Sequence, residues 1–340
     1  LQNLSLSPFS RGWSEGTRFY HASLLLSERY YGLSLPPFYQ DLSRYVLESI
    51  PLLLPHPSLW LERLWEFFLT FLLPASTVAL VLRRVVMRSG TPQTQAGYQY
   101  PAPRFLWLAL FLWGTLYLLQ GPVYFYLLLA AIPVLAFCHP DKPLSLLALV
   151  AASFWAGISR VNWIPIPAML AIALYLLETP ILKKSLVRYL APPALYALLG
   201  LVAAYAARQW YFSISGISLA LFIAAFAKPM LSYPLFPSAL QPLGILPAGL
   251  LMTAPLILLI WTHLREKRWH WIRVAGLVSM LLVLLAGGFL VSAKIGGGSN
   301  LHNLDGYLTL SLVIGLYFLF DRFAPDLQPA SSPRAFSPLT

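Results

Sequence analysis

The stretch KIGGGSNLHNLD, which starts at Lys294, combines several groups that bind anions. Three consecutive glycines allow positive φ and a close backbone approach, so that successive N–H groups can form an anion-binding nest. A helix that begins at Asn303 or Asp305 directs the positive end of its dipole to the same place, and Lys294 adds a full charge. The pattern predicts a phosphate or pyrophosphate site made by Lys294, Gly296, Gly297, Gly298, Asn300, His302, Asn303 and Asp305.

A simpler interpretation of this stretch stays open. Glycines also make tight turns, an asparagine caps helices, and a lysine can extend its charge to lipid headgroups. The stretch is not a Walker A loop, because its lysine precedes the glycines and no GK[ST] follows. His302 and Asp305 could ligate a metal together with His21 or Glu15, but no HExxH or paired-carboxylate pattern supports this. We therefore expect neither a metal nor another cofactor.

A second set of polar residues lies near the start of the chain. In EGTRFYHA, Glu15, Arg18 and His21 are three residues apart and share one face of a helix. Glu15 is a candidate general base for an acceptor hydroxyl, with Arg18 keeping it ionised, and the alternative is a surface salt bridge. Arg44 and Glu48, in DLSRYVLES, are interpreted as a structural pair. The apolar residues between these charges predict short amphipathic helices on the membrane surface.

Arg160 and Asn162, in SRVNWIPIP, follow directly after an apolar segment. An arginine at that depth is costly unless it faces a polar cavity or extends to the headgroups, and its planar guanidinium suits bidentate phosphate contacts. Both residues are candidates for substrate binding, with snorkelling of Arg160 as the alternative. Tyr124 and Tyr126 are interpreted as interfacial anchors, although aromatic rings near a sugar site would also stack on the sugar.

The composition indicates what kind of scaffold holds these residues. Of the 340 residues, 58% are hydrophobic and 10% are charged, whereas about 25% of the residues of soluble proteins are charged. Apolar runs of roughly 15 to 22 residues indicate membrane helices rather than the alternating strands of a barrel. The net charge of +11 lies in short loops between these runs, which argues against a nucleic-acid partner. The single cysteine, Cys138, excludes an internal disulfide.

The sequence predicts an all-α, polytopic transmembrane helical bundle with about nine spans. These spans are residues 60–82, 105–119, 123–138, 144–158, 164–177, 189–207, 244–263, 274–292 and 307–320. Residues 1–59 are expected to form an outer-face segment with juxtamembrane helices, residues 60–320 the membrane domain, and residues 321–340 a disordered tail rich in proline and serine. Residues 217–227 are too short to span and are expected to form an interfacial or re-entrant helix.

The basic residues determine the expected orientation, because positively charged short loops face the cytoplasm. If residues 217–227 do not span, one side collects Arg83, Arg84, Arg88, Arg104, Lys142, Lys183, Lys184, Arg188, Arg265, Lys267, Arg268, Arg273 and Arg322. The other side carries Glu15, Arg160 and the glycine-rich stretch. We therefore expect an integral membrane protein whose active face points outward.

An acidic residue in a first outer loop, amphipathic helices after it and a late outer loop rich in glycine and asparagine resemble the GT-C superfamily of membrane glycosyltransferases. This superfamily includes protein O-mannosyltransferases and aminoarabinose transferases. The segments EGTRFYHASLL, SRVNWIPIP and KIGGGSNLHNLD also look like parts of uncharacterised bacterial multi-pass proteins related to it. Two features depart from the superfamily. Ser14 precedes the acid where an Asp-Glu pair is common, and the helix expected before that loop is missing, as in a fragment.

The resemblance implies a bacterial inner-membrane protein that transfers a sugar from a polyprenyl-phosphate carrier to an outer-face acceptor by an inverting mechanism. Glu15 matches the base of the superfamily, and Lys294, the glycines and Arg160 would hold the donor phosphate. Two alternatives remain, a non-catalytic protein that binds or translocates a lipid-linked sugar and a structural membrane subunit. A secondary transporter is not favoured, because the interiors of the predicted spans carry almost no charge.

Overall fold

The computed structural model describes residues 14–87, 104–139, 142–181, 186–218, 242–266, 269–295 and 301–324, together with short pieces between 220 and 238. Within these residues the chain is helical and contains no β-strand, which confirms the predicted all-α class. The tail from residue 325, the glycines and Asn300 of the 296–300 loop and most of the segment 217–227 lie outside the described residues.

Each predicted span forms a helix. The helices are α4 (Leu59–Met87), α5 (Arg104–Gln120), α6 (Phe125–Phe137), α7 (Leu144–Gly157), α8 (Ile166–Glu178), α9 (Leu186–Ser215), α11 (Ile245–Glu266), α12 (Trp271–Ile295) and α13 (Asp305–Leu319). Five stretches of the described chain are long and apolar enough to cross a membrane: Leu59–Val86, Val161–Glu178, Leu186–Ser215, Ile245–Arg265 and Trp271–Lys294. This is the pattern of an integral membrane protein. The other helices are shorter, so the number of nine spans stays a prediction.

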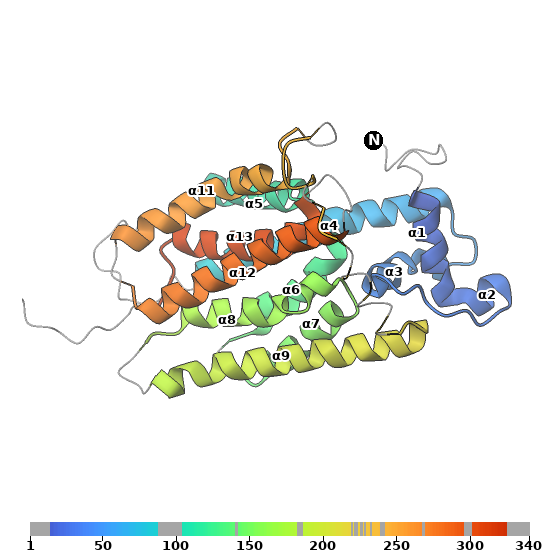
Figure 1. The fold of residues 1–340 in the computed structure, drawn as a ribbon, viewed down its shortest axis with the longest axis horizontal. Helices are drawn as coiled ribbons and strands as arrows, with labels where there is room; N and C mark the ends of the chain where they lie inside the picture. The colour runs from blue at the N-terminus through green and yellow to red at the C-terminus, as the bar shows by residue number, and fades with distance from the viewer. Residues whose placement is uncertain are drawn as a thin grey trace, which may run out of the picture.

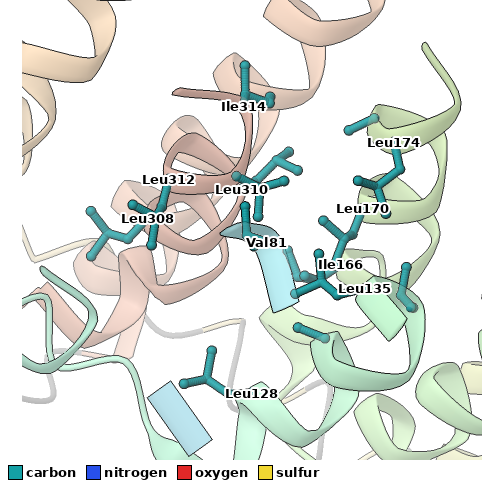
Figure 2. Close-up of a cluster of buried hydrophobic side chains, with 14 of the residues drawn as sticks. Val81, Leu128, Leu135, Ile166, Leu170, Leu174, Leu308, Leu310, Leu312 and Ile314 are labelled. Atoms are coloured by element: carbon teal, nitrogen blue, oxygen red, sulfur yellow. The ribbon is translucent and has the colours of Figure 1, made fainter. Parts of the chain in front are cut away.

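Helix α13 forms the centre of the bundle (Figure 1). All of its residues except Leu319 are buried, because the helix is apolar on all sides and lies among α4, α5, α8, α11 and α12. Figure 2 shows part of this core, where Leu308, Leu310 and Ile314 of α13 lie near Val81 of α4 and Leu170 of α8. A helix that is hydrophobic all round is expected in such a central position.

The peripheral helices expose apolar side chains. In the stretch Val161–Glu178, which contains α8, 67% of the residues are buried, whereas the most apolar parts of α11 and α12 are each 22% buried. Leu251, Leu258 and Val283 are among the residues that these two helices expose. Large continuous apolar surfaces of this kind are expected where helices contact lipid tails.

Successive helices run in opposite directions, so the bundle has two ends. The basic end, as we call it, holds the last turns of α4 and α8 and the first turn of α12, and Arg83, Arg104, Lys142, Arg188 and Arg265 are exposed there. At the opposite end, which we call the site end, Arg208 of α9 donates to the carbonyl oxygen of Ser159 and Gly249 of α11 packs against Leu304. The chain between α9 and α11 thus leaves and returns at the site end, as the prediction for residues 217–227 requires.

The first segment of the chain covers the site end. It contains α1 (Ser14–Ser23), α2 (Ser27–Tyr31) and α3 (Leu42–Glu48), and α1 and α3 contact the first turns of α4 (Figure 1). We expected amphipathic helices lying on the membrane surface, but α3 is packed into the end of the bundle. The amide of Ser43 donates to the carbonyl oxygen of Ile158 over 3.4 Å, and the hydroxyl groups of Ser43 and Ser159 are 2.6 Å apart.

Candidate functional site

The structure brings five of the predicted site residues together at the site end. Arg160 lies in the loop between α7 and the short helix η5 (Val161–Trp163), and it meets the short helix η6 (Leu301–Leu304), which leads into α13. Its Nη2 donates to Oδ1 of Asn303 over 2.7 Å, its Nη1 donates to the carbonyl oxygen of His302 over 3.2 Å, and the same Nη1 lies 3.5 Å from Oδ2 of Asp305. We call Arg160, Asn162, His302, Asn303 and Asp305 the Arg160 cluster.

Further hydrogen bonds hold this cluster in place. Nδ2 of Asn162 donates to Oδ1 of Asp305 over 2.9 Å, and the amide of Gly306 donates to the same oxygen over 2.8 Å. Nδ2 of Asn303 donates to the hydroxyl oxygen of Ser292 on α12 over 3.1 Å. Two asparagines and one carboxylate therefore join three parts of the chain, with the guanidinium at their centre.

Burial sets the charge state of the cluster. Burial raises the pKa of Asp305 to about 6, although the charge of Arg160 opposes the shift. Burial and the charge of Arg160 lower the pKa of His302 to about 4. Burial lowers the pKa of Arg160, but Asp305 together with smaller contributions from Tyr126, Asp41 and Tyr124 raises that pKa overall. At neutral pH the cluster thus contains a charged arginine, a largely ionised Asp305 and a neutral histidine.

Two tyrosines connect the cluster to the helices of the first segment. The guanidinium carbon of Arg160 lies 5.2 Å from the ring centre of Tyr124, and the rings of Tyr124 and Tyr126 are stacked at 5.5 Å. The guanidinium carbon of Arg44 lies 6.0 Å from the ring of Tyr126 on its other side. The interpretation of Tyr126 as an interfacial anchor is wrong, because its side chain is fully buried. Its hydroxyl makes no hydrogen bond with a described residue.

Asp41 is a functional candidate that the sequence analysis missed. It precedes α3 with φ 53° and ψ 44°, a left-handed conformation that non-glycine residues seldom adopt, and its half-buried side chain does not cap the helix. Its charge contributes to raising the pKa of Arg160 and that of Asp305, after the larger effects of burial and of the direct partners. Asp41 is therefore a carboxylate on a left-handed backbone whose charge acts on the Arg160 cluster. The sequence signal was an aspartate before a helix, which normally indicates only a cap.

Glu15, the predicted base, has a different environment. Both of its oxygens accept hydrogen bonds from Arg63 of α4, Oε1 from Nε over 2.6 Å and Oε2 from Nη2 over 2.8 Å. The side chain of Glu15 is 4% exposed and that of Arg63 is fully buried. Such a bidentate pair fixes α1 against α4. The catalytic role of Glu15 stays a prediction, and the pairing with a residue 48 positions away could not be read from local spacing.

Arg18 and His21 belong to α1, and their side chains contact α4 and α3 rather than the Arg160 cluster. Nη1 of Arg18 is 4.0 Å from Oε1 of Glu66 on α4, and Nδ1 of His21 is 3.2 Å from the hydroxyl of Tyr45. The imidazole also stacks on Phe38 with ring centres 3.6 Å apart. These contacts give both residues a packing role in the first segment.

The predicted pair of Arg44 and Glu48 is confirmed, since Nε of Arg44 donates to Oε1 of Glu48 over 2.6 Å. Arg44 also lies 3.4 Å from Glu66, so this pair belongs to a larger buried ionic network that includes α4.

The remaining predicted ligands lie on the loop after α12. Lys294 is half-buried in the last turn of α12, and its side chain leaves the helix roughly 200° around from Ser292, which bonds Asn303. Gly296, Gly297, Gly298 and Asn300 lie outside the described residues. The described residues contain no group of three or more His, Cys, Asp or Glu side chains placed to hold a metal ion.

Comparison with protein-family models, with curated proteins and with solved structures finds no match to this chain. The resemblance to GT-C glycosyltransferases therefore stays a prediction.

Proposed function

We propose that this protein binds a lipid-linked sugar phosphate at the Arg160 cluster and transfers the sugar to an acceptor at the same end of the bundle. The observation that carries the proposal is a guanidinium that lies beside two stacked tyrosines and is held by polar side chains from separate parts of the chain. They meet at one end of a bundle whose outer helices expose apolar surface suited to a lipid tail. We further propose an outward orientation in a bacterial inner membrane.

Arg160 is the phosphate ligand in this proposal. Its partner Asp305 is held by Asn162 and Gly306, and the indole of Trp163 also acts on that carboxylate and lowers its pKa. A phosphate would compete with this 3.5 Å ion pair for Nη1 of Arg160, in the bidentate manner that guanidinium groups favour. The ring of Tyr124 beside Arg160 would then stack on the sugar.

Asp41 is the general base in this proposal. A base must be able to reach the acceptor, and both oxygens of Glu15 are already bonded to Arg63 whereas the Asp41 carboxylate has no such bond. The acceptor oxygen forms a bond to the anomeric carbon as its proton passes to Asp41. The bond from that carbon to the phosphate oxygen breaks, and its electron pair leaves on the phosphate beside Arg160.

A second function, binding without transfer, is favoured by one specific observation. The resemblance assigns the base to Glu15, and the ion pair with Arg63 occupies that carboxylate completely. A protein that has lost this base would still hold a phosphate at Arg160 and would carry or present the lipid-linked sugar.

The purified full chain, supplied with a polyprenyl-phosphate-linked sugar, distinguishes these functions. We expect Asp41→Asn to lower the transfer rate by about 10²–10⁴-fold, as is typical for loss of a general base, without changing lipid binding. Glu28→Gln, at an exposed carboxylate of α2, is the matched control and should leave transfer unchanged. Transfer that survives in Asp41→Asn but is lost in Glu15→Gln, with folding intact, would restore Glu15 as the base. Binding without any transfer by the unmodified protein would favour the second function.

A further inference from the structure

A groove at the basic end, far along the helices from the Arg160 cluster, has its own chemistry. It lies between the first turns of α7 and α9 and has a volume of about 560 Å³. This size is within the range of small-ligand sites, about 300–1,000 Å³. Its lining includes Lys142, Ser145, Leu146, Arg188, Leu195 and Tyr196.

The polar and apolar parts of this groove are separated. Lys142 and Arg188 are exposed at its rim, one from each helix. The floor is neutral, since Ser145 is buried and its hydroxyl donates to the carbonyl oxygen of His139 over 2.6 Å. Leu146 and Leu195 supply apolar walls. No described acidic residue lines the groove, so its charge is positive.

The surroundings of the groove are apolar and exposed. Leu147 of α7 is 65% exposed, and Val187 and Leu198 of α9 are 75% and 62% exposed. Exposed apolar side chains on membrane helices contact lipid tails, and the two cations stand at the end of this apolar surface, where headgroups lie. Both α7 and α9 begin at this end, so their helix dipoles also favour negative charge there.

We propose that this groove binds an anionic glycerophospholipid of the adjacent leaflet. Lys142 and Arg188 contact its phosphate from two sides, and one acyl chain lies along Leu146 and Leu195. Basic pockets between helices on the cytoplasmic side of membrane proteins bind anionic headgroups in this way. The bound lipid would hold the first turns of α7 and α9 together. This site shares no described residue with the Arg160 cluster, so it does not depend on the function proposed there.

The test measures binding of phosphatidylglycerol and of phosphatidylcholine to the purified full chain by native mass spectrometry. We expect the unmodified protein to retain phosphatidylglycerol preferentially. Lys142→Gln with Arg188→Gln should weaken that binding at least tenfold, because two charges near the headgroup are lost. Arg83→Gln with Arg104→Gln removes the same charge from exposed residues of the same end that do not line the groove, and this matched control should keep the preference.

A third variant distinguishes lipid binding inside the groove from general attraction to the charged surface of the basic end. Ala191→Phe fills the groove and keeps both cations, so it should weaken phosphatidylglycerol binding as well. Equal losses in the two double variants would overturn the proposal, because the attraction would then belong to the whole basic end. Unchanged binding in Ala191→Phe would also overturn it, since the lipid would not be entering the groove.

Discussion

Each end of the bundle contains a buried arginine with a carboxylate partner, and the two pairs differ in how completely their hydrogen bonds are satisfied. At the basic end, Arg84 contacts both oxygens of Glu178 at 3.0 and 2.8 Å. Its remaining N–H groups donate to the carbonyl oxygens of Leu135 and Cys138, both over 2.7 Å, at the end of α6. The hydroxyl of Tyr317 on α13 also donates to Glu178. This arginine joins α4, α6, α8 and α13.

At the site end, Arg160 reaches Asp305 only at 3.5 Å, although the indole of Trp163 also acts on that carboxylate and lowers its pKa. The buried hydroxyl of Tyr126 makes no hydrogen bond with a described residue. Buried polar groups are normally satisfied, and groups that are not often belong to a ligand site. Burial of an arginine alone therefore does not indicate function, and our proposal for Arg160 depends on the polar groups and rings around it.

Replacing Glu178 by Gln should have the largest effect on stability. Arg84 cannot lose its proton, so the variant leaves a buried charge without a carboxylate, and the free energy of unfolding should fall by about 3–5 kcal/mol. The single cysteine provides the measurement, since Cys138 is buried and becomes reactive to a thiol dye as the bundle unfolds. The control Glu28→Gln should not shift the midpoint temperature. If Glu178→Gln were as stable as the unmodified protein, the Arg84–Glu178 pair would not have the structural role that distinguishes the basic end from the site end.

The two tyrosines give a matched pair of smaller changes. Tyr317→Phe removes a hydrogen bond to a carboxylate and should cost about 1.5–3 kcal/mol of stability. Tyr126→Phe removes a hydroxyl that has no such bond, so stability should stay the same or rise slightly. Both variants are followed by the Cys138 assay. Equal losses in the two would mean that the hydroxyl of Tyr126 is satisfied in the folded protein.

Arg160→Met should act on binding more than on stability. Without the guanidinium, Asp305 can become neutral, since burial already raises its pKa to about 6. This limits the loss of stability in the variant. Affinity for a polyprenyl phosphodiester should fall at least tenfold, or about 1.4 kcal/mol. Titration of the lipid into purified protein measures this. Unchanged affinity together with a stability loss as large as that of Glu178→Gln would make Arg160 a structural residue.

The smallest expected effect is on the pH dependence of binding. Asp305 is ionised above about pH 6 and neutral below it, so acidification from pH 7.5 to 5 frees Arg160 from its carboxylate partner. A phosphodiester keeps its charge over this range, and its affinity should rise about threefold at pH 5, consistent with a modest electrostatic term. Asp305→Asn should bind equally at both values. A wild-type affinity that falls on acidification would contradict this assignment.

Much of the helical architecture could be predicted from the sequence, because apolar runs and the glycine and proline residues between them determine where helices form. The proximity of Arg160 and Asn162 to the stretch before α13 was also predicted, from the sidedness of charge. The pairs Arg84–Glu178 and Glu15–Arg63 were missed, since their members are 94 and 48 residues apart and no periodicity links them. We interpreted Arg84 and Arg273 as loop charges, but both are buried.

The left-handed conformation of Asp41 also could not be predicted from the sequence. Its neighbours favour a helix start, and no local residue pattern indicates the left-handed conformation that Asp41 adopts before α3. An aspartate at a cap and an aspartate in a left-handed conformation look the same in one sequence.

The most direct test of the difference between the two ends is the shift in the Cys138 unfolding temperature on adding a saturating polyprenyl-phosphate-linked sugar. A ligand that binds only the folded state stabilises it by RT ln(1 + [L]/Kd), so tighter binding gives a larger shift at the same ligand concentration. We predict a positive shift in the unmodified protein, a similar shift in the less stable Glu178→Gln and no shift in Arg160→Met. A full shift in Arg160→Met would contradict the assignment of the incompletely paired arginine to ligand binding.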